Sequence, residues 1–117
     1  MQDYRKLNVW RKAHQLVIDV YGQVPRYKVP EAWPLRDQTI RAAISIPANI
    51  AEGSGRGSDA DFRRFLFNSL GSCSELEYHL LLARDIKFLE ESAHGGLAEQ
   101  TAEVRRMLTG LIQTIQA

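Results

Sequence analysis

A chain of 117 residues is long enough to close one hydrophobic core, and its single cysteine excludes an internal disulfide. The 44% hydrophobic and 25% charged residues are typical of a globular domain and exclude an intrinsically disordered one. Because 15 basic and 14 acidic residues leave a net charge of only +1, the composition also excludes a strong overall attraction to nucleic acid or to an anionic membrane.

Apolar residues recur at helical spacing in four segments, and no stretch alternates as a β-strand requires. The first helix is expected over about residues 7–24, because Pro25, Pro30 and Pro34 prevent its continuation. One stripe of this helix is expected to face the core: Trp10, Ala13, Val17, Val20, Tyr21 and Val24.

The second helix is expected over about residues 35–53, where a glycine-rich run from Gly53 to Gly57 ends it. Pro47 lies inside this helix, lacks a backbone donor and crowds the carbonyl of Ala43. The sequence therefore predicts a second helix kinked at Pro47, with a break into two shorter helices as the alternative. Its core face is expected to comprise Ile40, Ala43, Ile44, Pro47, Ile50 and Ala51.

The third helix, expected over about residues 59–86, begins after Ser58, which forms with Asp61 a pattern similar to a capping box. Asp59 and Asp61 add negative charge to its first turn, where the helix dipole favours it. Its expected core stripe consists of Phe62, Phe65, Leu66, Ser69, Cys73, Leu76, Leu80 and Ala83.

The fourth helix is expected over about residues 96–116, after a loop around His94, Gly95 and Gly96. Its core residues are expected at heptad spacing: Leu97, Thr101, Val104, Leu108, Leu111 and Ile115. Four helices joined by short connections predict a single domain over residues 1–117. Its expected fold is an all-α, up-down-up-down antiparallel four-helix bundle.

The third helix carries a second apolar stripe on the side away from its core residues. Large apolar patches are uncommon on monomers, and the small residues Gly71 and Ser74 leave room for another helix to approach. We interpret this stripe as a subunit interface. In the alternative, the connection between the first two helices covers it, with Trp33 or Tyr27 as lids. The stripe consists of Phe67, Gly71, Ser74, Tyr78, Leu81 and Leu82.

The candidate catalytic and metal-binding residues lack partners at the required spacing. Glu75 and His79 lie four residues apart, but no second such pair exists. Cys73 falls on the core stripe, where burial disfavours the reactive thiolate. We therefore expect no enzymatic activity, no metal and no cofactor. The alternative is a small-molecule-binding or hydrolytic bundle, with His14, Glu52 and His79 around a pocket in the bundle or along the axis of a ring of subunits.

The glycine-rich loop after the second helix differs from nucleotide-binding loops, because it follows a helix and holds no lysine. Arg56, the free N–H groups that open the third helix, and Arg63 or Arg64 could nevertheless hold a backbone phosphate. If the protein binds nucleic acid, five arginines are the candidate ligands of the phosphates: Arg36, Arg41, Arg56, Arg63 and Arg64.

The sequence also predicts a cytoplasmic protein that does not enter a membrane. Its first ten residues lack the basic and then apolar pattern of a signal peptide. Uninterrupted apolar runs, such as Leu80–Ala83, are far shorter than the roughly 20 residues that span a bilayer. A single cysteine is compatible with a reducing compartment.

Several strings of residues resemble one bacterial family over nearly the whole chain. They are Leu7-x-Val-Trp10, the run Ser45-Ile-Pro-Ala-Asn-Ile-Ala-Glu-Gly53, Arg56 with Ser58, Phe62-Arg-Arg-Phe-Leu66, Gly71-Ser72 before Glu75-Leu-Glu77, and Met107-Leu-x-x-Leu-Ile112. The chain is similar to the four-helix bundle proteins once labelled S23 ribosomal proteins, which are encoded within intervening sequences of 23S rRNA genes and in other bacterial loci. The run from Ser45 to Gly53 is the most specific of these strings.

The resemblance implies a protomer that assembles into a homopentameric, barrel-like ring, and it does not imply an enzyme. Relatives similar to the accessory variability protein of diversity-generating retroelements bind a reverse transcriptase and nucleic acid through strongly basic surfaces. This chain, with its net charge of +1, departs from them in charge. We therefore expect a homo-oligomeric binding or scaffold protein, with RNA or a nucleic-acid-processing protein as its partner.

Overall fold

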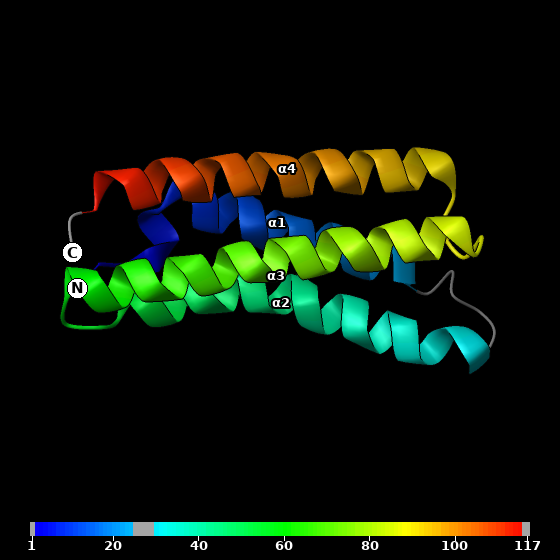
Figure 1. The fold of residues 1–117 in the computed structure, drawn as a ribbon, viewed down its shortest axis with the longest axis horizontal. Coiled ribbons are helices and arrows are strands. Elements are labelled where there is room, and N and C mark those ends of the chain that lie inside the picture. The colour runs from blue at the N-terminus through cyan, green and yellow to red at the C-terminus, as the bar shows by residue number, and fades with distance from the viewer. Residues whose placement is uncertain (1, 25–29, 116–117) are drawn as a thin grey trace.

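The computed structural model describes residues 2–24 and 30–115, in which four long α-helices pack side by side (Figure 1). The helices are α1 (Asn8–Gln23), α2 (Trp33–Ser54), α3 (Asp59–Asp85) and α4 (Glu91–Thr114), and two 3-10 helices, η1 (Tyr4–Lys6) and η3 (Pro30–Ala32), precede α1 and α2. Neither described range contains a β-strand. The prediction of an all-α four-helix bundle is confirmed.

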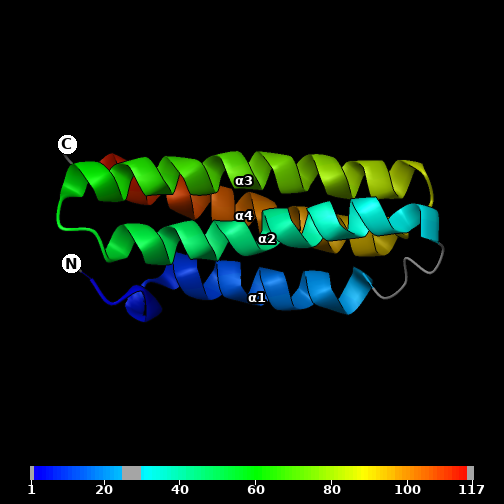
Figure 2. The same cartoon turned by 90° about the horizontal axis from the view of Figure 1, so that it is seen from below.

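The four helices form an elongated bundle of 45 × 21 × 20 Å. Consecutive helices run in opposite directions; α1 and α3 each pack against both α2 and α4 (Figures 1 and 2). The two helices α1 and α3 therefore occupy opposite corners of the bundle, and the outer face of α3 points away from α1. None of the helices in the described ranges combines the length and the hydropathy needed to cross a bilayer.

The N-terminus of α3 is capped as the sequence predicts. The Oγ of Ser58 accepts a hydrogen bond from the backbone N–H of Asp61 at 3.2 Å, and Asp59 and Asp61 occupy the first turn. This cap satisfies one of the free N–H groups of the helix end. The prediction of the α3 core stripe is confirmed, because all eight of its residues are buried: Phe62, Phe65, Leu66, Ser69, Cys73, Leu76, Leu80 and Ala83.

The core faces of α1 and α2 are rotated slightly from the predicted ones. Tyr21 and Ile44 were expected in the core, but 47% and 41% of their surfaces are exposed. Leu16 and Ile46 are fully buried instead. The physical reason is that the apolar stripes of both helices are wider than one core face, so spacing alone does not identify the centre of each stripe. The buried residues of these two helices are Val9, Ala13, Leu16 and Val20 in α1, and Thr39, Ala42, Ala43, Ile46, Pro47, Ile50, Gly53 and Ser54 in α2.

Pro47 lies inside α2 without ending it, so the alternative of two shorter helices is wrong. The ribbon of α2 follows α3 over its C-terminal part and diverges from α3 toward its N-terminal end, the change of direction that an internal proline predicts (Figure 1). Pro47 itself is buried. Its ring therefore packs in the core, where the lost backbone hydrogen bond is partly offset by apolar burial.

The fourth helix begins at Glu91, five residues before the predicted start, and Gly95 and Gly96 lie within it. The turn is formed by residues 86–90, where Lys87 adopts a left-handed conformation with φ of 69°. The backbone N–H groups of Phe88 and Leu89 bond to the carbonyl of Ala83 at 2.8 and 3.2 Å and close the end of α3. The buried Leu89 then anchors the chain in the core, which permits the helix to restart before the glycines.

Candidate interaction surface

The run from Ser45 to Gly53, the most specific string of the sequence, forms the inner side of the contact between α2 and α3. A Cβ added to Gly53 would lie 2.7 Å from the Cβ of Phe65, a distance that real Cβ atoms do not reach. Only glycine fits at this position, and the two backbones approach closely there. The string therefore contains a residue that is required for packing between two helices.

Polar side chains of the same string also join α2 to α3. The Oγ of Ser69 donates a hydrogen bond to the carbonyl of Ile46 at 2.8 Å, inside the core. Nearer the surface, the hydroxyl of Ser45 lies 2.6 Å from that of Ser72. The side-chain amide of Asn49 donates to the carbonyl of Ser45 at 2.8 Å. The bonds of Ser69 and Ser45 cross between the two helices and fix their register, whereas the Asn49 bond lies within α2.

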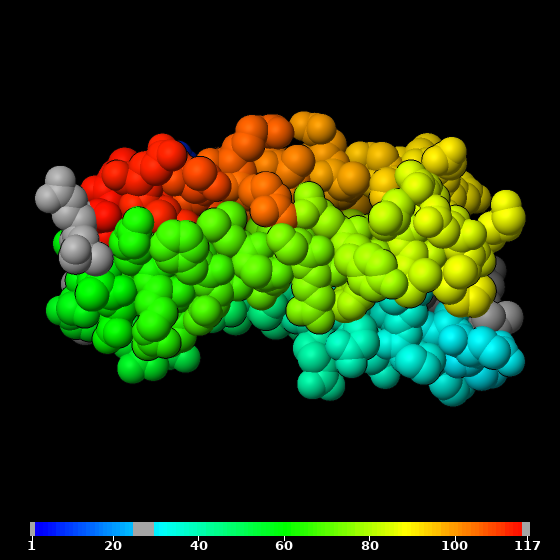
Figure 3. All heavy atoms as spheres, in the orientation of Figure 1, coloured from blue at the N-terminus to red at the C-terminus, as the bar shows by residue number. Residues whose placement is uncertain are grey.

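This seam leaves the opposite side of α3 uncovered. Phe67, Tyr78 and Leu81 expose 48%, 58% and 38% of their surfaces, Gly71 and Ser74 are exposed, and Leu82 is half-buried. We call these six residues the outer α3 face. Figure 3 shows α3 crossing the middle of the molecular surface between α4 and α2, with neither helix lying over it. The predicted exposure of a second apolar stripe is confirmed.

The alternative in which Trp33 covers this face is wrong. Trp33 is itself 48% exposed, and its indole ring lies 5.8 Å from the guanidinium carbon of Arg36 on its own helix. The other proposed lid, Tyr27, lies outside the described residues. A second subunit over the outer α3 face stays a prediction.

Gly71 occupies the centre of the outer α3 face, where packing within the described part of the chain does not require a glycine. A Cβ added there would meet no atom within 4 Å, in contrast to Gly53. A glycine inside an exposed helix destabilises the helix by roughly 0.5–1 kcal/mol relative to alanine. Beside it, Ser74 accepts a hydrogen bond from Arg105 of α4 at 3.0 Å, and Arg105 also pairs with Glu77.

Three arginines, Arg56, Arg63 and Arg64, lie near the turn between α2 and α3, and two of them pair with carboxylates. Arg56 pairs with Glu52 at 3.8 Å and Arg64 pairs with Asp61 at 3.4 Å. The guanidinium carbons of Arg56 and Arg64 lie 4.9 and 4.5 Å from the ring centroid of Phe65. The aromatic ring thus holds two cations near one another.

Arg63 has no ion pair among the described residues, and its guanidinium carbon lies 5.1 Å from the ring centroid of Phe67. The Nε of Arg63 is shielded from solvent and has no hydrogen-bond partner in residues 2–24 and 30–115. A hollow of about 320 Å³ opens beside it, lined by Ala60, Arg63, Arg64, Phe67 and Asn68.

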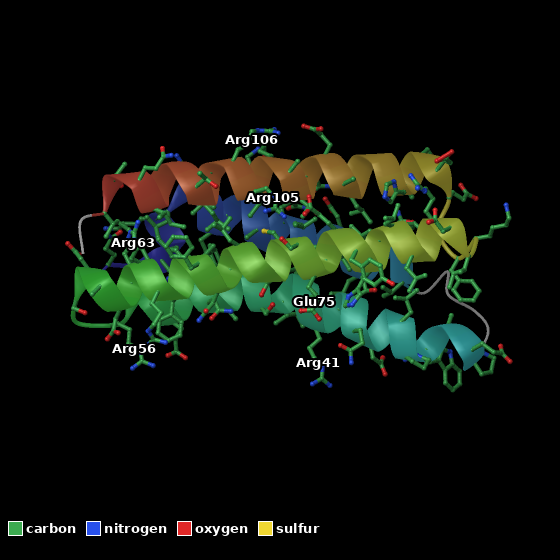
Figure 4. All side chains as sticks on the ribbon, in the orientation of Figure 1. Arg41, Arg56, Arg63, Glu75, Arg105 and Arg106 are labelled. Carbon is green, nitrogen blue, oxygen red and sulfur yellow. The ribbon has the colours of Figure 1, made fainter. Side chains whose placement is uncertain are left out.

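The other two candidate arginines lie apart from this group, on the N-terminal part of α2. Arg36 pairs with Asp37 at 3.4 Å, whereas Arg41 is exposed and has no ion pair within the described ranges. Figure 4 shows Arg41 and Arg56 projecting from well-separated positions along the bundle. The structure therefore divides the five predicted phosphate ligands into two groups, and nucleic-acid binding stays a prediction.

The residues proposed for a catalytic pocket do not meet. The imidazole of His14 stacks on Trp10 with centroids 4.9 Å apart, Glu52 pairs with Arg56, and His79 lies 3.9 Å from Glu75. These three candidates belong to three different helices, and none of them lines the hollow beside Arg63. In the described ranges, no group of three or more His, Cys, Asp or Glu side chains is placed to hold a metal ion.

Cys73 is fully buried in the core beneath the outer α3 face. Burial raises the pKa of its thiol to about 12, because the charged thiolate would lose its hydration. The thiol therefore acts as a small apolar group in this fold.

The fold of the chain agrees with comparisons to known proteins. The model of the 23S rRNA-intervening sequence protein family matches residues 5–110. No curated protein sequence matches the chain. A crystal structure of a protein of unknown function from the S23 ribosomal protein family of Bacteroides thetaiotaomicron VPI-5482 superposes with a TM-score of 0.83 at 23% sequence identity, over 89% of this chain and 97% of that chain. The two chains therefore share a fold, and the link to retroelements stays a prediction.

Proposed function

The chain belongs to the 23S rRNA-intervening sequence protein family, and from this premise we propose that it is a non-enzymatic, homo-oligomeric scaffold protein whose subunits associate through the outer α3 face. The observation that carries the proposal is the exposure of Phe67, Tyr78 and Leu81 along one side of a helix whose other side is buried. Monomers rarely expose a continuous apolar stripe of this kind.

The energetics of this face support an interface between proteins. Burying a side chain such as Phe67 or Leu81 contributes roughly 1.5–3 kcal/mol relative to leaving it in water. Gly71, which lies between the aromatic residues with open space above it, permits another helix to approach the backbone closely. The stability that this glycine costs the isolated helix is offset if a second subunit packs against it.

We propose a closed ring of five subunits as the assembly, the form that the resemblance to the family implies. In a ring, each subunit presents one surface to its neighbour on one side and a different surface to its neighbour on the other side. The exposed residues Ile18 and Tyr21 of α1 and Ile44 of α2 lie outside the outer α3 face, and they offer apolar area for the second surface.

As the partner of this cytoplasmic ring we propose RNA or a nucleic-acid-processing protein. The support is that a ring repeats each exposed arginine five times, so weak single contacts would combine into one avid interaction. Arg41, exposed and without a carboxylate partner among the described residues, is the clearest cation for this purpose. A subunit alone carries a net charge of +1 and would bind a polyanion weakly.

The proposal is tested by light scattering on a sizing column, with the wild type beside Tyr78→Asp. A wild-type mass of several protomers that falls toward one protomer in Tyr78→Asp is the expected result, because a carboxylate cannot be buried unpaired in an apolar interface. Thr109→Asp, which adds the same charge at an exposed position of α4, is the matched control and should keep the wild-type mass. A monomeric wild type at all concentrations would contradict the proposal.

A further inference from the structure

Arg63 differs from the arginines around it in having no anion to neutralise it. Arg56 and Arg64 are paired with Glu52 and Asp61, whereas Arg63 has no carboxylate within salt-bridge distance among the described residues. Its guanidinium lies against the exposed ring of Phe67, four residues later on the same helix, so it belongs to the N-terminal edge of the outer α3 face. Figure 4 shows the side chain of Arg63 near the start of α3.

Burying the Nε–H group of Arg63 costs free energy, and no hydrogen bond within the described residues offsets this cost. This N–H group is shielded from water and meets no acceptor there, and an unsatisfied buried donor costs on the order of 1–3 kcal/mol. The neighbouring hollow of about 320 Å³ has room for a group from outside the protomer. An acceptor that entered this hollow would reach both the guanidinium and the edge of Phe67.

Assembly through the outer α3 face would increase the need of Arg63 for an anionic partner. Any surface that covers Phe67 also covers the guanidinium lying on its ring. An arginine taken out of water without an anion is strongly destabilising, whereas a carboxylate can bond to its planar fork at two points. The surface opposite Arg63 must therefore carry an anion, or the interface would lose the energy gained from the aromatic side chains.

We propose that Arg63 forms an intersubunit ion pair with a carboxylate of the neighbouring copy and fixes the register of the outer α3 face in the assembly. This inference rests on the proposed self-association. Four exposed carboxylates have no cationic partner within residues 2–24 and 30–115 and are candidates for the opposite member of the pair: Glu31, Asp59, Glu90 and Glu91.

The local charge favours a protein carboxylate over a nucleic-acid phosphate. Around the turn between α2 and α3, the sequence carries three carboxylates, Glu52, Asp59 and Asp61, beside the three arginines. A polyanion approaching this end would meet the carboxylates as well as the arginines, and its attraction grows with the number of uncompensated cations. A single carboxylate needs only one guanidinium in a bidentate pair.

The test compares Arg63→Gln with Arg106→Gln on α4 as a matched control, by light scattering over a dilution series of each full-length chain. Arg63→Gln should raise the concentration at which the assembly dissociates by about tenfold or more, because it removes one member of a buried ion pair. Arg106→Gln, whose charge is already paired with Glu99 at 3.3 Å and lies outside the hollow, should dissociate near the wild-type concentration. Equal thermal unfolding of the variants by circular dichroism would show that the protomer is intact.

The outcomes separate this inference from the proposed function. An associated wild type with an unchanged dissociation concentration in Arg63→Gln would overturn the ion pair and leave the proposed assembly standing, whereas a monomeric wild type would overturn both.

The same variants are titrated with a single-stranded RNA of about 20 nucleotides, long enough to contact several phosphate sites. A loss of RNA affinity in Arg63→Gln without a change of mass would assign Arg63 to phosphate binding and overturn the inference. Rescue of a charge reversal, Arg63→Glu, by Lys at one of the four carboxylates would identify the partner residue.

Discussion

Gly53 of α2 and Phe65 of α3 come so close that a methyl group on Gly53 would lie 2.7 Å from the Cβ of Phe65. Because the obstructing atom is a Cβ, rotation of the phenyl ring cannot relieve the contact, and one helix would have to move. The distance between α2 and α3 therefore depends on the absence of a side chain at residue 53.

Gly53→Ala is expected to destabilise the fold by about 1–3 kcal/mol, the usual cost of excess volume in a packed core. Urea unfolding followed by circular dichroism measures the change. Gly95→Ala is the matched control: a Cβ there meets no atom within 4 Å, so the variant should be as stable as the wild type or more stable by up to about 1 kcal/mol. An equal gain of stability in both variants would contradict the close contact.

Gly71→Ala should have opposite effects on the protomer and on its assembly. In the isolated protomer, alanine should stabilise α3 by about 0.5–1 kcal/mol, since the space above Gly71 is open. In the proposed assembly, the same methyl group would hold the neighbouring helix away and promote dissociation. Unfolding under dilute conditions and light scattering at high concentration measure the two effects. Gly110→Ala on α4 should show the stabilisation alone, and an unchanged mass of Gly71→Ala would show that no helix packs closely over this residue.

Ser69→Ala is expected to lower the free energy of unfolding by about 1 kcal/mol. The change removes the buried hydrogen bond from the Ser69 hydroxyl to the carbonyl of Ile46, and the typical net value of such a bond is of this size. The matched control is the exposed Ser92 near the start of α4, where alanine should alter stability by less than about 0.5 kcal/mol. Equal stability of Ser69→Ala and the wild type in urea would argue against a role for this bond in joining α2 to α3.

The buried thiol of Cys73 predicts a loss of stability at alkaline pH. Burial raises its pKa from 9.0 to about 12, so above pH 9 the unfolded chain ionises the thiol while the folded chain keeps it protonated. The stability contributed by this difference is fully present below pH 9 and is lost as the pH rises toward 12. Between about pH 8 and pH 10, the wild type should lose about 1 kcal/mol more than Cys73→Ala, which has the same lysines and tyrosines. Parallel stability curves for the two proteins would contradict the prediction.

The sequence was most informative for α3. Its capping residue and one stripe of eight residues predicted its start and every residue that it buries. In α1 and α2 the apolar stripe extends beyond the buried face, and Tyr21 and Ile44 lie at its exposed margin. The start of α4 was predicted too late because Gly95 and Gly96 resemble a turn, whereas the closing bonds of α3 to the Ala83 carbonyl place the turn earlier.

The candidate surface was predicted only in part. Helical periodicity identified the outer α3 face, because the spacing of residues within α3 is enough to reveal its second apolar stripe. The unpaired state of Arg63 could not be predicted, because it depends on which carboxylates lie near the neighbouring arginines after folding. The bridge from Arg105 to Ser74 and Glu77 was missed for the same reason: nothing in the spacing of α3 indicates which residue of α4 lies beside it.

The placement of the run from Ser45 to Gly53 has a consequence for its relatives. Its Ser45 and Gly53 face the seam with α3, and its isoleucines and proline lie in the core. A chain that inherits this run inherits the spacing of two helices, whereas the outer α3 face is free to diverge without disturbing that spacing. Two proteins with the same run of residues can therefore share the fold of the single chain and differ in the molecules that bind to its outer α3 face.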